Sequence, residues 1–183
     1  MNKLKQYIFE YLRKRMPERE ARFPHLDQPL KVMIIYESDY LERNDAIKSI
    51  RQDLLRRHLD VSMWGYIEKK DIKTLILPQS RILGVDDYSW YGKPKDFVLK
   101  DLQAEHYDLL IDLTTHTMLP LRYLTMYAEA DFKVGLNLGE GVHDMLISLP
   151  DFAPEEDGEQ VSIEAGWLFQ NIMNYLTTIK SND

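Results

Sequence analysis

The sequence predicts an α/β protein, a three-layer α/β/α Rossmann-like sandwich around a mainly parallel sheet of five to six strands. Two observations predict this fold. Runs such as LKVMIIY at 30–36 and YDLLIDL at 107–113 are almost continuously apolar, as in strands covered on both faces. Between such runs lie longer segments with apolar residues at three- and four-residue spacing, which is typical of amphipathic helices. This alternation favours parallel strands joined by right-handed crossovers.

The composition is that of an ordinary globular domain and excludes several kinds of chemistry. The 183 residues are 44% hydrophobic and 29% charged. The chain has no cysteine, which excludes disulfides, thiol catalysis and thiolate-bound metals. A formal net charge of −7 argues against nucleic-acid binding. No apolar run approaches the ~18 residues of a membrane span, and no secretory signal is recognisable, so we expect a cytoplasmic protein.

The N-terminal residues differ in charge from the rest of the chain. Residues 1–24 contain seven Lys or Arg and three Asp or Glu, which leaves 16 basic and 27 acidic residues elsewhere. We expect an amphipathic helix over 3–16, ended by Pro17, within a basic arm of residues 1–29. The arm precedes a single Rossmann-like domain, 30–183. Its helix is expected to dock on this domain, on a second copy or on another protein; the alternative is contact of its basic face with an anionic membrane surface or nucleic acid.

The first half of the domain has the pattern strand–helix–strand. An Asx residue is expected to cap its helix, and turn-forming residues follow in DDYSWYGKPK. The predicted elements are, in order, a strand at 30–36, a helix from Asn44 or Asp45 to about His58, a strand at 61–67 and a short strand at 82–85 within the irregular segment 68–94.

The second half alternates helices and strands in the same way. A proline in the first turn favours the start of one of these helices, and five acidic groups mark a surface loop. The predicted elements are a helix at 95–105, a strand at 107–113, a helix from Pro120 to Ala130, strands at 132–136 and 145–149, an acidic loop at 150–160 and a helix at 162–179.

The loops that follow the predicted strands contain the candidate site residues. In an open parallel sheet, ligands bind outside the carboxyl ends of the strands, near the point where the strand order reverses. The candidates for catalysis are Asp39, Thr114, His116 and His143, and the candidates for ligand binding are Glu37, Trp90, Lys93, Thr115 and Asp144.

These loops contain few of the residues that nucleotide, metal and acid–base sites require. The loop ESDYLERND after the first strand has no glycine and several acids, so no nucleotide cofactor is expected. His116 and His143 could bind zinc or manganese together with Asp144 and Asp39. They share no short spacing, however, and no metal is expected. Glu37 and Asp39 form either an acid–base pair or a solvated acidic loop.

Asp112 lies inside the predicted strand at 107–113, where an unpaired carboxylate would be costly. We expect it to cap the adjacent loop or helix; the alternative is that it orients His116. Trp90 and Lys93, in the segment WYGKP, form either a plug against the sheet, which we favour, or a stacking platform with one cation.

The segment YDLLIDLTTHTMLPLRYLTMYAEADFKVGLN, residues 107–137, resembles the N-terminal half of heptosyltransferase-like GT-B glycosyltransferases. The resemblance implies their succession of strand, loop, helix and strand. That family has a Gly-Asp near its acceptor site, for which Asp39 is only a loose positional counterpart. The chain is too short to contain the family's nucleotide-sugar half as well, so the resemblance implies a half-fold without the donor site.

The segments DYSWYGKPK, YDLLIDL, ADFKVGL and DMLISL resemble, in this order, a family of small uncharacterised bacterial proteins. This resemblance implies the same fold and a bacterial cytoplasmic setting, and no catalytic residues. We therefore expect a binding or assembly module without enzymatic activity, with a small-molecule ligand and a homodimer or protein partner at the N-terminal helix. The alternative is an enzyme acting on a sugar or small metabolite, with the four catalytic candidates around one cleft.

Overall fold

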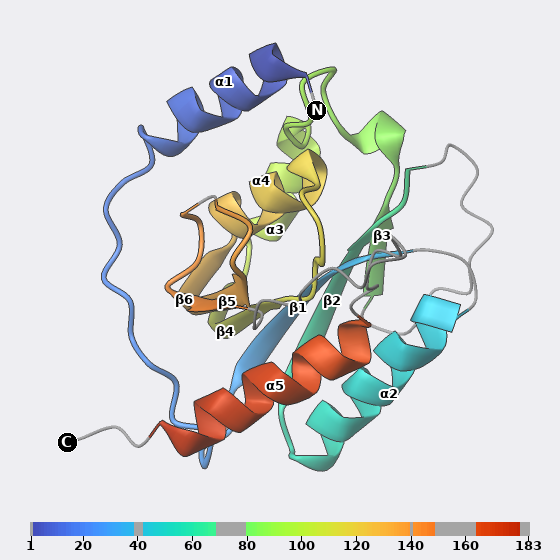
Figure 1. The fold of residues 1–183 in the computed structure, drawn as a ribbon, viewed down its shortest axis with the longest axis vertical. Coiled ribbons are helices and arrows are strands. Elements are labelled where there is room, and N and C mark those ends of the chain that lie inside the picture. Colours follow the sequence, from blue (N-terminus) through green and yellow to red (C-terminus); the bar gives the residue numbers. More distant parts are fainter. Residues whose placement is uncertain (1, 39–41, 69–79, 140, 149–163, 180–183) are drawn as a thin grey trace, which may run out of the picture.

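The fold is an open sheet between two layers of helices. The computed structural model describes residues 2–38, 42–68, 80–139, 141–148 and 164–179. Figure 1 shows the sheet at the centre of the molecule, with one helix, α1, lying beyond the two layers at one end.

Six parallel strands form the sheet in the order β3-β2-β1-β4-β5-β6. From β1 the chain proceeds outward to β3, crosses to β4 on the other side of β1, and proceeds outward to β6. The strand order therefore reverses between β1 and β4, and the loops after these two strands flank the expected ligand position. The strands are β1 (Lys31–Glu37), β2 (Asp60–Tyr66), β3 (Ser80–Leu83), β4 (His106–Asp112), β5 (Glu129–Leu136) and β6 (Met145–Ile147).

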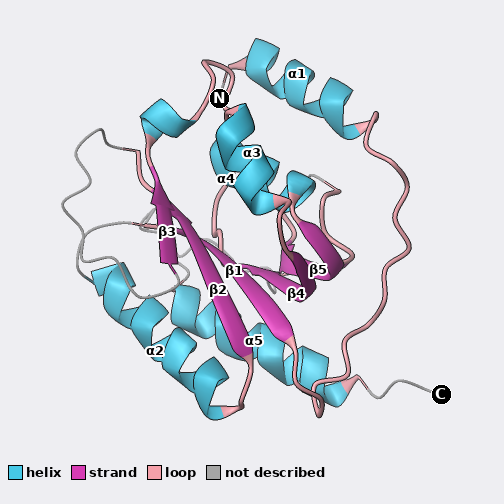
Figure 2. Ribbon diagram, turned by 180° about the vertical axis from the view of Figure 1, so that it is seen from behind, coloured by secondary structure: helices cyan, strands magenta, loops and turns pink. Residues whose placement is uncertain are grey.

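Helices cover both faces of the sheet. Figures 1 and 2 show α2 (Glu42–Arg56) and α5 (Ala165–Thr178) on one face, with α3 (Asp96–Leu102) and α4 (Leu119–Tyr127) on the other. Each face has its own apolar core, one shared with α2 and α5 and the other with α3 and α4. The three-layer α/β/α fold predicted from the sequence is thus confirmed, and the sheet is wholly parallel.

The central strand β1 explains why its sequence is apolar at nearly every position. Val32 and Ile34 belong to the core under α2 and α5, whereas Met33 and Ile35 belong to the core under α3 and α4. All four are 0% exposed. Since successive side chains of a strand point to opposite faces, a strand covered on both sides needs apolar residues throughout.

Several element boundaries in the first half differ from the predicted ones by one to three residues, three of them as follows. Helix α1 (Lys3–Arg13) is shorter than predicted and ends before Pro17, which therefore does not terminate it. Helix α2 begins at Glu42, ahead of the predicted caps Asn44 and Asp45. Strand β3 ends two residues earlier than predicted because the 3-10 helix η1 (Val85–Asp87) follows at once.

The junction between α4 and β5 also differs from the prediction. The helix ends at Tyr127 rather than Ala130, and the strand begins at Glu129 rather than Phe132. The strand begins earlier because Glu129 and Ala130 pair with the first residues of β4. The predicted acidic loop at 150–160 lies outside the described residues.

Helix α1 is attached to α4 by apolar side chains, of which Phe9 is fully buried and Leu12 partly buried. Phe9 is 0% exposed, and its ring meets Tyr123 edge-on, with 5.0 Å between the ring centroids. The Arg122 guanidinium lies 4.6 Å from the Phe9 ring centroid. The connector after α1 continues along β5, where the backbone N–H of Arg22 donates to the Asp131 carbonyl at 3.0 Å. The N-terminal arm is thus packed against the sheet-containing part of the chain.

Within the described residues, no helix has the length and hydrophobicity needed to cross a lipid bilayer.

Phe9→Ala is expected to lower the free energy of unfolding by about 3 kcal/mol, because it leaves a cavity between α1 and α4. Urea denaturation followed by circular dichroism measures this loss. Tyr11→Ala, on the exposed side of the same helix, is the matched control and should change stability by no more than about 0.5 kcal/mol. If Phe9→Ala changes stability as little as Tyr11→Ala does, the arm does not unfold together with the rest of the chain.

Candidate functional site

Asp112, the last residue of β4, is a buried carboxylate surrounded by hydrogen-bond donors. Its Oδ1 accepts from the backbone N–H of Thr114 at 2.9 Å and from the Thr114 hydroxyl. Its Oδ2 accepts from the Thr125 hydroxyl at 2.9 Å and lies 3.0 Å from Nε2 of His143. The carboxylate therefore joins the loop after β4, helix α4 and the loop before β6.

These contacts keep Asp112 ionised although it is only 3% exposed. Burial by itself raises the pKa of this carboxyl, but the hydrogen bond and charge of His143 and the two hydrogen bonds from Thr114 outweigh it and lower the pKa below its ordinary value. An ionised carboxylate accepts hydrogen bonds at both oxygens, as the geometry requires.

The His143 ring reaches Asp112 by crossing over Gly135 in β5. A Cβ at position 135 would lie 2.6 Å from Nε2 of His143, so only glycine permits this approach. The His143 side chain is 4% exposed as a result. With Nε2 facing Asp112, the carboxylate fixes the orientation of the imidazole ring.

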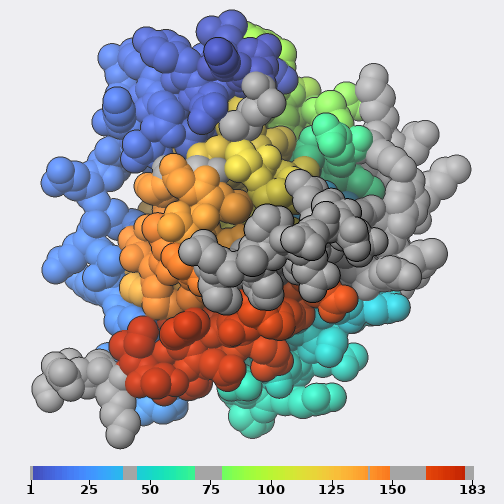
Figure 3. Space-filling model, viewed as in Figure 1, coloured from blue at the N-terminus to red at the C-terminus, as the bar shows by residue number. Residues whose placement is uncertain are grey.

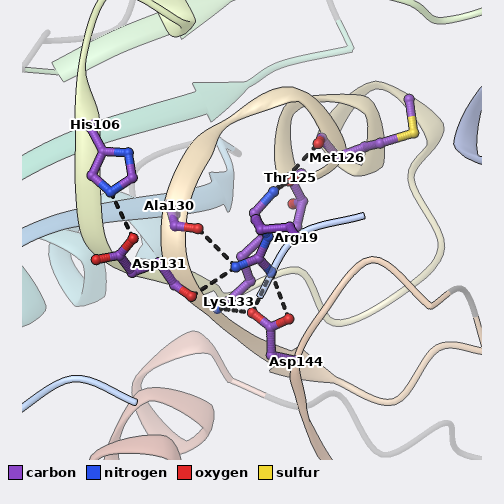
Figure 4. Close-up of polar contacts among 8 residues, drawn as sticks. All are labelled: Arg19, His106, Thr125, Met126, Ala130, Asp131, Lys133 and Asp144. Carbon is purple, nitrogen blue, oxygen red and sulfur yellow. Dashed lines mark hydrogen bonds and ion pairs between the residues drawn. The ribbon is translucent and has the colours of Figure 1, made fainter. Parts of the chain in front are cut away.

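A second polar network lies beside β5, where the N-terminal connector crosses the sheet edge (Figure 4). Arg19 donates to the carbonyls of Ala130 and Asp131 at 2.9 and 2.8 Å, and to the Asp144 carboxylate at 2.6 Å. Asp144 also accepts from the backbone N–H of Lys133 at 2.7 Å. Arg19 therefore holds the connector against β5.

Lys133 is a buried lysine in the middle of β5. Its Nζ donates to the Thr125 carbonyl at 2.7 Å, near the C-terminal end of α4, where cations satisfy free carbonyls. Burial, reinforced by the charge of Arg19, lowers its pKa to about 8, against the opposing effect of Asp144. Lys133 and His143 line a cavity of about 550 Å³ beneath the connector, which we call the connector cavity.

A larger cavity, of about 730 Å³, opens at the carboxyl edge of the sheet. We call it the carboxyl-edge cavity. Its walls come from the end of β2, from η1 and the turn after it, from the loop after β4 and from the start of α1. Its lining includes the side chains of Asn2, Lys5, Tyr88, Trp90, Lys95 and His116.

Tyr88 lines this cavity, and its hydroxyl is buried. The residue is 7% exposed, and among the described residues its hydroxyl has no hydrogen-bond partner. The ring meets Tyr66 edge-on at 5.2 Å between centroids. Burial raises the pKa of Tyr88 well above its ordinary value, so the hydroxyl keeps its proton and can both donate and accept.

The structure distributes the predicted catalytic residues over different places. His116 lines the carboxyl-edge cavity, with Nδ1 3.5 Å from Oε2 of Glu37. Thr114 is buried against Asp112, and His143 lines the connector cavity. Asp39 lies outside the described residues.

Asp112 caps the adjacent loop through Thr114, as expected. The histidine that it contacts is His143 and not His116, which corrects the alternative interpretation. The partner was missed because the contact depends on a close approach over Gly135, which sequence spacing does not reveal.

The predicted ligand-binding residues also lie apart. Trp90 is 64% exposed at the carboxyl-edge cavity. Lys93 is half-buried, with Nζ 5.7 Å from the Tyr127 ring centroid, and Thr115 is half-buried. Asp144 lines the connector cavity, bound by Arg19.

Several residues of these sites were not singled out from the sequence, among them Arg19, Tyr88, Thr125 and Lys133. A lysine inside the strand segment FKVGL was a usable signal, because a buried cation needs partners. The other three have no local pattern that distinguishes them from ordinary polar residues. Among the described residues, no three His, Asp or Glu side chains gather as metal ligands would.

The wholly parallel sheet with helices on both faces defines a Rossmann-like α/β fold. The chain belongs to DUF6913, a family of unknown function whose model matches residues 2–156. No curated protein matches it. A solved structure of the E. coli heptosyltransferase WaaC with ADP is similar at a TM-score of 0.47 and 13% identity, over 76% of this chain and 46% of that one. The chain thus matches less than half of that enzyme's length. The family match agrees with the resemblance to an uncharacterised family seen in the sequence.

Asp112→Asn is expected to lower the free energy of unfolding by roughly 3 kcal/mol at pH 7, because it breaks a buried pair. Since the pKa of Asp112 is lowered on folding, its contribution is present above about pH 4 and disappears as the pH falls through the folded-state pKa. The difference from the wild type should therefore shrink in acid. Urea titrations at several pH values measure it, with the exposed Asp27→Asn as control. A difference independent of pH would contradict the ionised state.

Lys133→Met tests the buried lysine. The folded protein releases the Lys133 proton near pH 8, whereas the unfolded chain keeps it to about pH 10, so unfolding takes up a proton between these values. The wild type should gain roughly 1 kcal/mol of stability per pH unit over this range relative to Lys133→Met. Parallel stability curves for the wild type and Lys133→Met would show that Lys133 titrates normally; Lys100→Met, at an exposed lysine, is the control for the loss of a charge.

Proposed function

We propose that this protein is a cytoplasmic bacterial binding module without enzymatic activity, whose ligand is a sugar phosphate held in the carboxyl-edge cavity. The observation that carries the proposal is the Tyr88 hydroxyl, which is buried beside the cavity without a partner among the described residues. Leaving a buried hydroxyl unsatisfied costs stability, and a ligand hydroxyl would remove that cost.

The position of the cavity supports the same proposal. It lies at the carboxyl edge of the sheet. Its lining includes His116, which follows β4, and the strand order reverses between β4 and β1. Small-molecule sites in open α/β sheets occur at this place. A volume of about 730 Å³ is also within the range of such pockets.

The side chains around the cavity suit a ring with hydroxyl and phosphate groups. The exposed Trp90 ring offers an apolar face against which a sugar ring can pack. Lys5 and Lys95 provide cations for a phosphate; Lys95 uses one of its three donors on the Asp86 carbonyl at 2.6 Å. Because Lys5 comes from α1, the N-terminal arm contributes to the ligand site.

The candidate catalytic residues lie in different parts of the structure, which favours a binding role over catalysis. An enzyme of the alternative kind needs its reacting groups around one substrate. His116 lines the carboxyl-edge cavity, His143 lines the connector cavity, and Thr114 is bonded to Asp112. The catalytic candidates that the structure describes therefore do not surround one cleft, as that alternative requires.

Tyr88→Phe provides the test. In the ligand-free protein, removing an unsatisfied hydroxyl should raise the free energy of unfolding by about 1 kcal/mol. The same substitution should weaken binding of a hexose or pentose monophosphate by roughly tenfold, because it removes one hydrogen bond. Thermal shift over a panel of these compounds, followed by calorimetry on the best of them, measures both effects.

The controls separate the contributions of sugar and phosphate. Tyr175→Phe, on the exposed side of α5, should change neither stability nor binding. Inorganic phosphate and unphosphorylated sugars should bind more weakly than the sugar phosphates. The proposal fails if no sugar phosphate raises the melting temperature, or if one binds equally well to Tyr88→Phe.

A further inference from the structure

The outward side of α1 is a second feature that the fold leaves unused. Three large apolar side chains are exposed on this one helix: Leu4 at 54%, Tyr7 at 69% and Tyr11 at 46%. At about 100° per residue they fall within a narrow arc of the helix. Phe9, which anchors α1 to α4, lies on the opposite side. The apolar residues of α1 therefore form two faces, and only the inner one is covered.

Cations surround the uncovered apolar side chains. Lys3 lies at the start of the helix, and Lys14 and Arg15 lie at its C-terminal end, all exposed and on the same side. The Arg15 guanidinium lies 4.4 Å from the Tyr11 ring centroid. The acid of this helix, Glu10, is bonded to Arg13. We define the outer face of α1 as Lys3, Leu4, Tyr7, Tyr11, Lys14 and Arg15.

We infer that the outer face of α1 docks on an anionic lipid bilayer, with the helix lying in the plane of the membrane surface. Tyrosine and leucine between lysine and arginine residues match the membrane interface, where aromatic rings enter the headgroup layer and cations contact anionic lipids. A net charge of −7 over the whole chain and a basic α1 would orient the molecule with this helix toward the lipid.

The shape of the molecule permits this contact. The space-filling view shows α1 at one end of the molecule and α2 and α5 at the other (Figure 3). A flat surface can therefore meet α1 without meeting these two helices. No covering helix has to move, since the outer face is exposed in the structure.

Co-sedimentation with lipid vesicles tests the inference. The full chain should sediment with vesicles in which about a third of the phosphatidylcholine is replaced by phosphatidylglycerol, and not with phosphatidylcholine alone. High salt should weaken the binding, because screening reduces attraction to anionic lipids.

Two pairs of variants assign the binding to α1. Lys3→Gln/Lys14→Gln should weaken it by more than tenfold, at roughly fivefold per cation, whereas Arg56→Gln/Arg57→Gln on α2 should leave it unchanged. Tyr7→Ser should weaken it severalfold, whereas Tyr175→Ser, at an exposed tyrosine on α5, should not. All the substituted residues are exposed, so circular dichroism should show unchanged folding.

Three results would overturn the inference. The first is an absence of binding to the anionic vesicles at low salt. The second is an equal loss of binding in the α1 variants and in their matched controls. The third is a dimer in light scattering that Tyr7→Ser dissociates while vesicles remain unbound, which would assign the outer face to a second copy. None of these results depends on the proposed sugar-phosphate site, since the outer face does not include Tyr88 or Trp90.

Discussion

The buried charge of Asp112 is the constraint on which the rest of the site depends. An ionised carboxylate at the end of a central strand is tolerated only when its oxygens are hydrogen-bonded and its charge is matched. Here the donors come from three segments, represented by Thr114, Thr125 and His143. Folding must therefore bring the loop after β4, helix α4 and the loop before β6 to one point.

Both cavities are connected to this network. The loop that begins at Thr114 continues to His116 in the wall of the carboxyl-edge cavity. His143 faces the connector cavity from the other side of the network. In the connector cavity Arg19, Lys133 and Asp144 are bonded to other groups of the protein. In the carboxyl-edge cavity a buried hydroxyl lacks a partner among the described residues. This difference, and not size, is the reason for proposing a ligand at the carboxyl edge.

The sequence predicted the layers and the place of the cavity, but not the contacts within it. Strands β1 and β4 were recognisable because burial on both faces demands continuous apolar residues. His116 and Trp90, nominated by the rule for parallel sheets, both line the carboxyl-edge cavity. The contact of Asp112 with His143 joins residues 31 positions apart and depends on the missing side chain of Gly135. Arg19 and Asp144 are 125 positions apart, so no local pattern indicates that pair.

A crystal structure of the full chain grown with a hexose monophosphate tests the central claim most directly. The account predicts the sugar in the carboxyl-edge cavity, with one of its hydroxyl groups within hydrogen-bond distance of the Tyr88 oxygen and its ring against Trp90. A sugar bound in the connector cavity, or an unoccupied carboxyl-edge cavity at a saturating concentration of the compound, would contradict it.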